Sequence, residues 1–257
     1  MGAKEHLSLG RVIDLIEGID QGQLYLDYQP VVDVISGRVH AVEALVRWAH
    51  PRLGLLAPDA FLPHAQASRL GSVVTAFVLR QACLQWTAWR DAGIRVRLAV
   101  NVPPGELVDE TVPGLIAELA GLGFDASALT IEVTERRIDA LVDLGPTLEA
   151  MRSQGVGLSI DDFGTGDSTL VRLQDLCFNE IKIDRCFTDG VTCDGTARKI
   201  IRFATELAHG LGMVVVAEGV EVAAQLASLR VLDVDLVQGY HLARPGTAQA
   251  VTALMLA

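Results

Sequence analysis

The chain has 257 residues, of which 50% are hydrophobic and only 5% aromatic, and its formal net charge is −11. This length suits one α/β barrel or two smaller domains. No linker rich in Pro, Gly or Ser divides the chain, so we interpret residues 1–257 as a single domain with a lead-in helix within 1–20. The acidic balance argues against a protein that coats long nucleic acids, because such proteins neutralise phosphates with Lys and Arg.

Cysteine usage and hydropathy indicate the compartment. The four cysteines form no CxxC pair, and no His accompanies them at metal-ligand spacing. We therefore expect neither a disulfide framework nor a zinc site, and a reducing environment. No apolar stretch is long enough to cross a bilayer, and no signal-type run follows Met1. These features predict a cytoplasmic protein, or the cytosolic domain of a larger one.

Short β-branched runs alternate with helical patterns, which is typical of βα units around a parallel sheet. Residues 24–34 and 39–46 are joined by too short a stretch for a crossover helix, so these strands must form an antiparallel hairpin. Further strands are expected at 96–102, 129–134, 157–161, 180–184, 213–217 and 235–237, and helices at about 73–92, 138–153, 200–211 and 221–231.

Eight strands with one running against the rest predict an α/β fold, a modified TIM-type (β/α)₈ barrel with one antiparallel strand. A doubly wound open sheet is the alternative. That fold would need a GxGxxG-type first turn, which the sequence lacks.

Acidic and amide side chains gather at the expected carboxyl ends of the strands, where parallel barrels place their active sites. On the second strand Glu43, Leu45 and Arg47 share one face, because side chains alternate along a strand. Alone, Glu43 and Arg47 are more typical of a structural ion pair. The other strand ends favour a site, since they carry Asn101, Glu132, Asp161 with Asp162, Lys182, Glu218 and Gln238.

Converging carboxylates repel one another in a partly desolvated mouth unless a cation neutralises them. Ligands that are all oxygen atoms select hard cations, so we expect Mg²⁺ or Mn²⁺, with Ca²⁺ as a competitor. For any one acid the alternative is a salt bridge or a helix N-cap. The glycine loop 163–166, directly after two acids, is a candidate mobile lid.

The chain resembles the EAL-domain phosphodiesterases of bacteria, which hydrolyse cyclic di-GMP. The resemblance covers nearly the whole chain and rests on the Asn101 strand end and on YQPVVD at 28–33, EALVRW at 43–48, EVTE at 132–135, DDFGTG at 161–166, KIDR at 182–185, AEGVE at 217–221 and QGY at 238–240. It implies hydrolysis of one phosphodiester to give linear 5′-pGpG.

The resemblance also implies roles for single residues. One cation would be held by Glu43, Asn101, Glu132 and Asp161, and a second by Asp161, Asp162 and Glu218, so one or two Mg²⁺ or Mn²⁺ ions are expected and Ca²⁺ should inhibit. Lys182 would orient the attacking water, acting as a catalytic residue together with Glu43 and Glu218. Glu135 would brace the glycine loop. Substrate contacts are expected from Gln29, Arg47, Asp184 and Gln238.

Three departures from the family pattern leave the rate of turnover open: Asp167 stands where a tyrosine is usual, and Cys177 and Asn179 alter the stretch before KIDR. The alternative is therefore a cyclic di-GMP receptor domain that hydrolyses its ligand negligibly. A domain used only for protein contacts is a third interpretation, which the intact acidic set disfavours. The resemblance is compatible with a homodimer and with a sensory or GGDEF domain in a longer parent protein.

Overall fold

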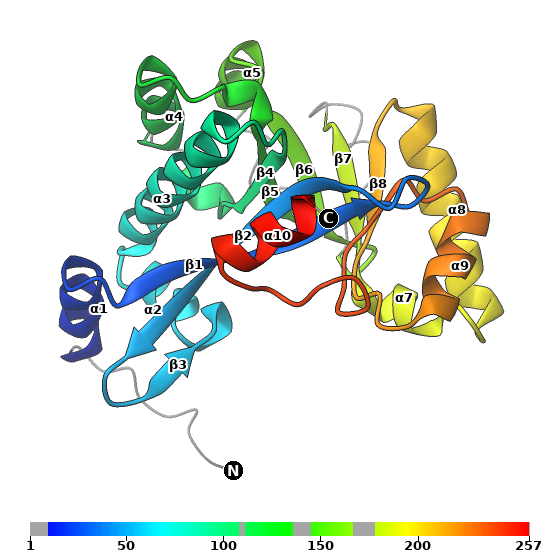
Figure 1. Cartoon of the computed structure of the whole chain (residues 1–257), viewed down its shortest axis with the longest axis horizontal. Coiled ribbons are helices and arrows are strands. Elements are labelled where there is room, and N and C mark those ends of the chain that lie inside the picture. The colour runs from blue at the N-terminus through cyan, green and yellow to red at the C-terminus, as the bar shows by residue number, and fades with distance from the viewer. Residues whose placement is uncertain (1–9, 108–110, 136–144, 167–177, 257) are drawn as a thin grey trace.

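The computed structural model describes residues 10–107, 111–135, 145–166 and 178–256. Within these residues nine strands form one sheet in the order β1-β9-β8-β7-β6-β5-β4-β2-β3, and a further pairing of β1 with β2 closes it into a barrel (Figure 1). The strands are β1 (Leu24–Asp33), β2 (Val39–His50), β3 (Gly54–Leu56), β4 (Arg97–Asn101), β5 (Leu129–Thr134), β6 (Gly157–Phe163), β7 (Glu180–Ile183), β8 (Val214–Ala217) and β9 (Leu236–Val237).

Strand β1 is the antiparallel member of the barrel, since it runs against both of its neighbours, β2 and β9. The pairs from β2 to β4 and onward to β9 are parallel. Their carboxyl ends therefore meet at one end of the barrel. The predicted modified (β/α)₈ barrel and its hairpin are confirmed. The short strand β3, which extends β2 outside the closed barrel, was not predicted.

The hairpin between β1 and β2 contains a β-bulge. Val31 pairs with Ala41, whereas its neighbour Val32 pairs with Val39, so His40 is the extra residue. A bulge of this kind shifts the pairing register by one residue and increases the local twist. All the pairs closer to the mouth depend on this shift, including Gln29 opposite Glu43.

Helices cover the outside of the barrel (Figure 1). The predicted helices at 73–92 and 221–231 correspond to α3 and α9, the pattern at 200–211 to the second half of α8, and the end of 138–153 to α5, residues 138–144 lying outside the described residues. The helices are α1 (Gly10–Asp20), α2 (Leu62–Ala67), α3 (Gly71–Asp91), α4 (Thr111–Gly121), α5 (Gly145–Ser153), α7 (Arg185–Gly190), α8 (Gly195–Gly210), α9 (Ala223–Val231) and α10 (Ala248–Leu256).

The core is divided by the alternation of the strands. One face of each strand, with Leu98, Ile131 and Ile181 as examples, joins the large apolar core that includes the helices. A second, separate cluster consists of Val31, Ala41, Val216 and Leu236. Ala41, Val216 and Leu236 each lie two residues before a predicted site residue, and Val31 lies two residues after Gln29, so each shares a strand face with a site residue. These four side chains therefore fill part of the barrel interior below the mouth.

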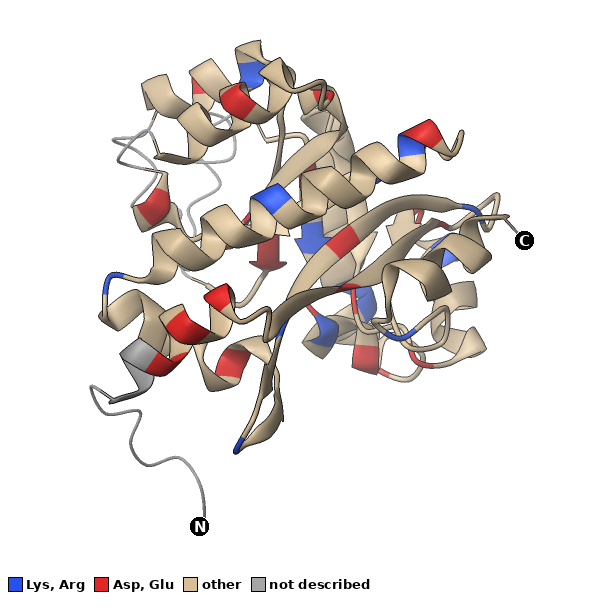
Figure 2. Cartoon of the chain, turned by 60° about the vertical axis from the view of Figure 1, so that its left-hand side comes forward, with Lys and Arg blue, Asp and Glu red and all other residues tan. Residues whose placement is uncertain are grey.

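The surface carries both signs of charge. Acidic and basic residues are interspersed along the outer helices and loops in the view of Figure 2. In the described ranges, no helix combines the length and the apolar character needed to cross a membrane. Cys83, Cys186 and Cys193 are free thiols.

Candidate active site

Three strand ends converge on the carboxylate of Glu43. The side chain is buried, and its Oε1 accepts a hydrogen bond of 2.6 Å from Nδ2 of Asn101 at the end of β4. Its Oε2 accepts one of 2.7 Å from Nε2 of Gln238, which follows β9. Gln29 lies directly opposite Glu43 in the hairpin register. The sequence brings these residues together because each occupies the inward face at a strand end.

Lys182 lies at the centre of the acidic cluster. Its side chain is 1% exposed, and β7 directs it into the barrel. Nζ lies 2.7 Å from Glu218, 3.0 Å from Glu132, 3.4 Å from Asp161 and 3.5 Å from Glu43. One ammonium group therefore balances part of the charge of four carboxylates.

The pKa values of these groups are set by burial and by one another. Burial lowers the pKa of Lys182, but the four surrounding carboxylates reverse this and hold it well above its usual value. Burial raises the pKa of Glu132 well above its usual value, with Lys182 opposing and the neighbouring carboxylates adding to the rise. Burial is also the main reason that the pKa of Glu218 rises to about 8. For Glu43, burial is outweighed by Lys182 and by the two amide donors, which lower its pKa.

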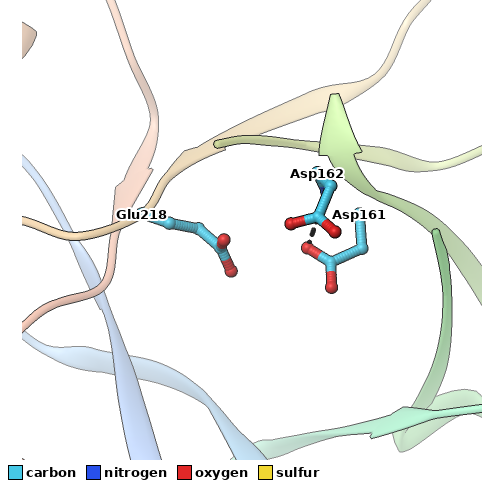
Figure 3. Close-up of side chains that lie close together, drawn as sticks. All are labelled: Asp161, Asp162 and Glu218. Atoms are coloured by element: carbon cyan, nitrogen blue, oxygen red, sulfur yellow. Dashed lines mark hydrogen bonds between the residues drawn. The ribbon is translucent and has the colours of Figure 1, made fainter. Parts of the chain in front are cut away.

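Two consecutive acids reach the same site because β6 is distorted at its end. Strict alternation would send Asp161 and Asp162 to opposite faces. The structure instead gives Asp162 a positive φ of 58° and shifts the register with β7 between Ile160 and Phe163. One carboxylate oxygen from each of Asp161, Asp162 and Glu218 then lies within 4.8 Å of the other two. Figure 3 shows the three carboxylates facing one another. We expected this strand to end at residue 161, but Asp162 lies within β6, in its bulge.

Glu135 follows β5 and connects it with the glycine loop. Its Oε2 accepts hydrogen bonds from the backbone N–H of Gly164 at 2.9 Å and of Gly166 at 2.8 Å. The side chain is buried, so the surrounding residues and these two hydrogen bonds together hold its carboxylate in place. The loop that follows the two acids is thus attached to the neighbouring strand end.

Arg47 makes its ion pair with a residue that the sequence analysis missed. Its Nε lies 3.0 Å from Oδ2 of Asp27, and both side chains are largely buried. The expected alternative, an ion pair between Glu43 and Arg47, is not what forms in the described part of the chain: Glu43 pairs with Lys182. Asp27 could have been found by counting two residues back from Gln29 along the same strand face.

The remaining predicted residues lie as follows. Asp184 caps α7, where its carboxylate accepts a hydrogen bond of 2.9 Å from the N–H of Cys186. Gln29 donates from Nε2 to the carbonyl of Ala243 at 3.3 Å. The side chain of Asn179 accepts from the N–H of Leu158, at the opposite end of the strands. Asp167 and Cys177 lie outside the described residues.

Two cavities flank the cluster, and Leu45 lines both. The first, of about 460 Å³, extends from Asn101 and Glu132 toward Gln66 and Glu106. The second, of about 320 Å³, is lined by Gln29, Glu43, Leu45, Asp161, Arg185, Glu218, Gly219, Glu221, Gln238, Gly239 and Tyr240. A larger hollow, of about 600 Å³, is lined by Arg97, Gly157 and Glu180 at the amino ends of the strands. The acidic cluster and the carboxyl strand ends favour the two mouth cavities as the site.

The side chain of Arg185 lines the second cavity and packs directly against Gly219. Gly219 has a positive φ of 72°, and a Cβ atom placed there would collide with Cγ of Arg185. The guanidinium is directed by ion pairs with Glu221 at 2.8 Å and with Asp189 at 3.3 Å. Glycine is therefore required at 219 both for its backbone angle and for space.

The donor set fits a divalent cation. Asp161, Asp162 and Glu218 offer one carboxylate oxygen each at mutually close positions, and no described Cys or His joins them. Oxygen donors of this kind suit hard cations. Burial raises the pKa of Glu218 and repulsion from Asp161 and Glu43 adds to the rise, so a cation at this position would favour the ionised carboxylate.

The family model for the EAL domain matches residues 14–245. Among curated relatives, the cyclic di-GMP phosphodiesterase NbdA of Pseudomonas aeruginosa is 41% identical over 239 residues, which cover 90% of this chain and 30% of that protein. The bifunctional diguanylate cyclase/cyclic di-GMP phosphodiesterase MucR of the same species is 38% identical over 98% of this chain and 37% of its own length. The chain therefore spans about a third of the length of these relatives.

Solved structures of EAL domain proteins also match this chain. The PaMucR phosphodiesterase in complex with c-di-GMP is 36% identical, with a TM-score of 0.87 over 95% of this chain and 100% of that chain. The EAL domain protein from Listeria monocytogenes is 29% identical, with a TM-score of 0.81 over 97% of this chain and 98% of that chain. The barrel with its one antiparallel strand, the acidic mouth and these matches have one explanation: the chain belongs to the EAL domain family.

Proposed function

We propose that this chain is a phosphodiesterase that hydrolyses cyclic di-GMP to linear 5′-pGpG with Mg²⁺ or Mn²⁺. The observation that carries the proposal is the convergence of carboxylates around Lys182 at the barrel mouth. Five acids take part, namely Glu43, Glu132, Asp161, Asp162 and Glu218. Relatives named as cyclic di-GMP phosphodiesterases, at 36–41% identity, support the choice of substrate.

The acidic groups would hold the cations in two sets that share Asp161. Glu43, Asn101 and Glu132 would complete one set, and Asp162 and Glu218 the other. When bound, such cations supply charge for the phosphate and lower the pKa of an attacking water. They also explain how an acidic protein could hold an anionic dinucleotide.

The other residues of the mouth would position the reactants. Lys182, which is buried among the acids, would hold and orient the attacking water through its ammonium group. Gln238 fixes Glu43 and would keep that carboxylate in one orientation. Gln29 and Arg47 share the face of the hairpin that carries Glu43, and would contact the nucleotide. Asp184 would lie close to it at the start of α7.

The proposal extends to the setting of the domain. A cytoplasmic location is supported by the free and exposed thiols of Cys186 and Cys193, which a reducing compartment preserves. Because the matched relatives are about three times longer, sensory or GGDEF domains in a longer parent protein belong to the proposal. So does a homodimer, which size-exclusion chromatography with light scattering would test.

The test is a product assay. Purified protein with Mn²⁺ should convert cyclic di-GMP to pGpG, with GMP slow or absent, and EDTA should stop the reaction. Glu43→Gln should reduce the rate by about 10² or more, because a cation ligand loses its charge. The matched control is Glu118→Gln, which alters an exposed carboxylate paired with Arg80 on the outer helices.

Calorimetry with Ca²⁺ separates this proposal from the alternatives. Binding of cyclic di-GMP without release of pGpG in Mn²⁺ would identify a receptor. If the protein neither bound nor hydrolysed cyclic di-GMP, the remaining interpretation would be a domain used only for protein contacts. Full activity in EDTA would contradict the cation dependence.

A further inference from the structure

Arg47 is held in place on the rim of the mouth before any ligand arrives. Its Nε donates to Oδ2 of Asp27 at 3.0 Å, and its Nη1 donates to the backbone carbonyl of Val46 at 3.1 Å. The side chains of Arg47 and Asp27 are 14% and 16% exposed, so solvent screens the pair only in part. A long side chain that otherwise samples many rotamers is thereby restricted to one direction.

Asp27 lies on the inward face of its strand and not on the outer surface of the barrel. In the hairpin register Asp27 lies opposite Leu45, and Tyr25 lies opposite Arg47. Directly paired residues share a face of the sheet. Asp27 therefore lies on the face that carries Gln29 and Glu43, and it reaches Arg47 diagonally across the two strands.

The guanidinium keeps donors for a ligand. Arginine has five N–H groups, and the two contacts use one on Nε and one on Nη1. Three more, on Nη1 and Nη2, make no hydrogen bond to any residue that the structure describes, which is sufficient for a bidentate contact with two oxygens of a phosphate. A carboxylate on Nε thus orients the guanidinium without occupying the end of its fork.

We propose that Asp27 is a positioning residue for Arg47, which fixes the guanidinium so that its remaining N–H groups meet a phosphate of the substrate. The inference rests on the proposed function, and it adds a residue that none of the recognised motifs contains. Asp27 acts through its hydrogen bond to Nε and touches no reacting atom. Its influence is therefore on substrate binding, and the chemical step is unaffected.

The conservative and the truncating variants give different expectations. Asp27→Ala frees Arg47 and should raise KM about 10-fold with kcat within about 2-fold, because an oriented, charge-assisted contact made in both ground and transition states is weakened. Asp27→Asn keeps an acceptor oxygen for Nε and should stay within about 3-fold of wild type in KM. In an Arg47→Ala background, Asp27→Ala should change nothing further, since the two residues act as a unit.

The experiment measures KM and kcat for pGpG release with Mn²⁺ in wild type, Asp27→Ala, Asp27→Asn, Arg47→Ala and the Asp27→Ala/Arg47→Ala double variant, together with the melting temperature of each. Glu118→Ala, which breaks the exposed ion pair with Arg80, is the control and should keep the wild-type KM. Should wild type bind but not hydrolyse, its dissociation constant measured in Ca²⁺ replaces KM, with the same ratios expected.

Each contrary result has its own meaning. A lower KM in Asp27→Ala would show that Asp27 screens the charge of Arg47 and does not position it. An unchanged KM in Asp27→Ala, or an equal rise in the Arg47→Ala background, would overturn the inference while the proposed function stands. Wild type that neither binds nor hydrolyses cyclic di-GMP would overturn both.

Discussion

The Nζ atom of Lys182 lies 2.7 Å from Oε1 of Glu218, and this is the shortest of the four ion pairs that the buried ammonium makes. Lys182 is thus a counterion of the acidic cluster. A cation that binds among the same oxygens must share or replace these contacts.

Removing the ammonium should destabilise the metal-free protein more than the metal-bound one. Lys182→Met keeps most of the side-chain volume but leaves four buried or half-buried carboxylates uncompensated, which should cost about 3–5 kcal/mol in the free energy of unfolding. Mg²⁺ at about 100 times its dissociation constant should return about 2.7 kcal/mol. Urea denaturation in EDTA and in Mg²⁺ measures both. Lys199→Met, on the exposed face of α8, is the control, and an unchanged urea midpoint for Lys182→Met in EDTA would contradict the prediction.

The stability of the metal-free protein should fall as pH rises from about 5 to 9. The pKa of Glu218 is about 8 in the folded protein and about 4.3 when unfolded, so the folded state binds the extra proton in this range. The contribution of Glu218 to the free energy of unfolding is therefore complete below about pH 4.3 and is lost as the pH rises through about 8. Mg²⁺ binding needs the ionised form, so the stabilisation that Mg²⁺ gives should grow over the same interval.

Melting curves in EDTA and in Mg²⁺ at several pH values measure this dependence. Glu218→Gln cannot titrate, and it should flatten the slope in EDTA. If Glu218→Gln kept the wild-type slope, another group would be responsible.

The contact between Glu135 and the glycine loop should affect turnover although Glu135 is not among the expected cation ligands. Glu135→Ala removes the acceptor for the N–H groups of Gly164 and Gly166. Displacing the two preceding acids by about 1 Å could lower the rate ~10²-fold and weaken Mn²⁺ binding. Steady-state kinetics and Mn²⁺ titration test this, with Glu149→Ala on the outer helix α5 as control. Wild-type behaviour of Glu135→Ala would rule out the bracing role.

Gly219→Ala should alter the second cavity through Arg185. The new methyl group would collide with Cγ of Arg185 and would also strain a backbone with φ of 72°. Gly212→Ala imposes a similar φ of 75° with nothing within 4 Å, so it isolates the backbone strain, which is about 1 kcal/mol. We expect both variants to lose stability, and Gly219→Ala alone to weaken substrate binding as measured by calorimetry in Ca²⁺. Equal affinities in the two variants would show that Arg185 does not contribute to binding.

Much of the fold was predictable because period-2 alternation and strand-end acids are local properties of the sequence. The strands of the closed barrel were placed to within a few residues, apart from the longer end of β2. Strand β3 was missed because Gly54–Leu56 is too short to display a period. Helices α4 and α10 were also missed, since their compositions are apolar almost all round.

The fine geometry of the site was not predictable, because it depends on two bulges. The bulge at Val31 and Val32 shifts the hairpin register by one residue. A prediction that assumes a regular hairpin would therefore not pair Asp27 with Leu45. The bulge in β6 turns Asp162 toward Asp161, whereas alternation alone predicts the opposite face. Bulges are settled by tertiary packing and leave no clear local pattern.

The distortion at Asp162 has a consequence for attempts to rebuild this site elsewhere. A designer who copied the acids onto an ideal barrel of regular strands would direct one of the two neighbouring aspartates into the outer layer, among apolar side chains. The transplanted centre would lose an oxygen donor, and the scaffold would gain a buried charge. An irregular strand end therefore has to be transferred together with the residues that it carries.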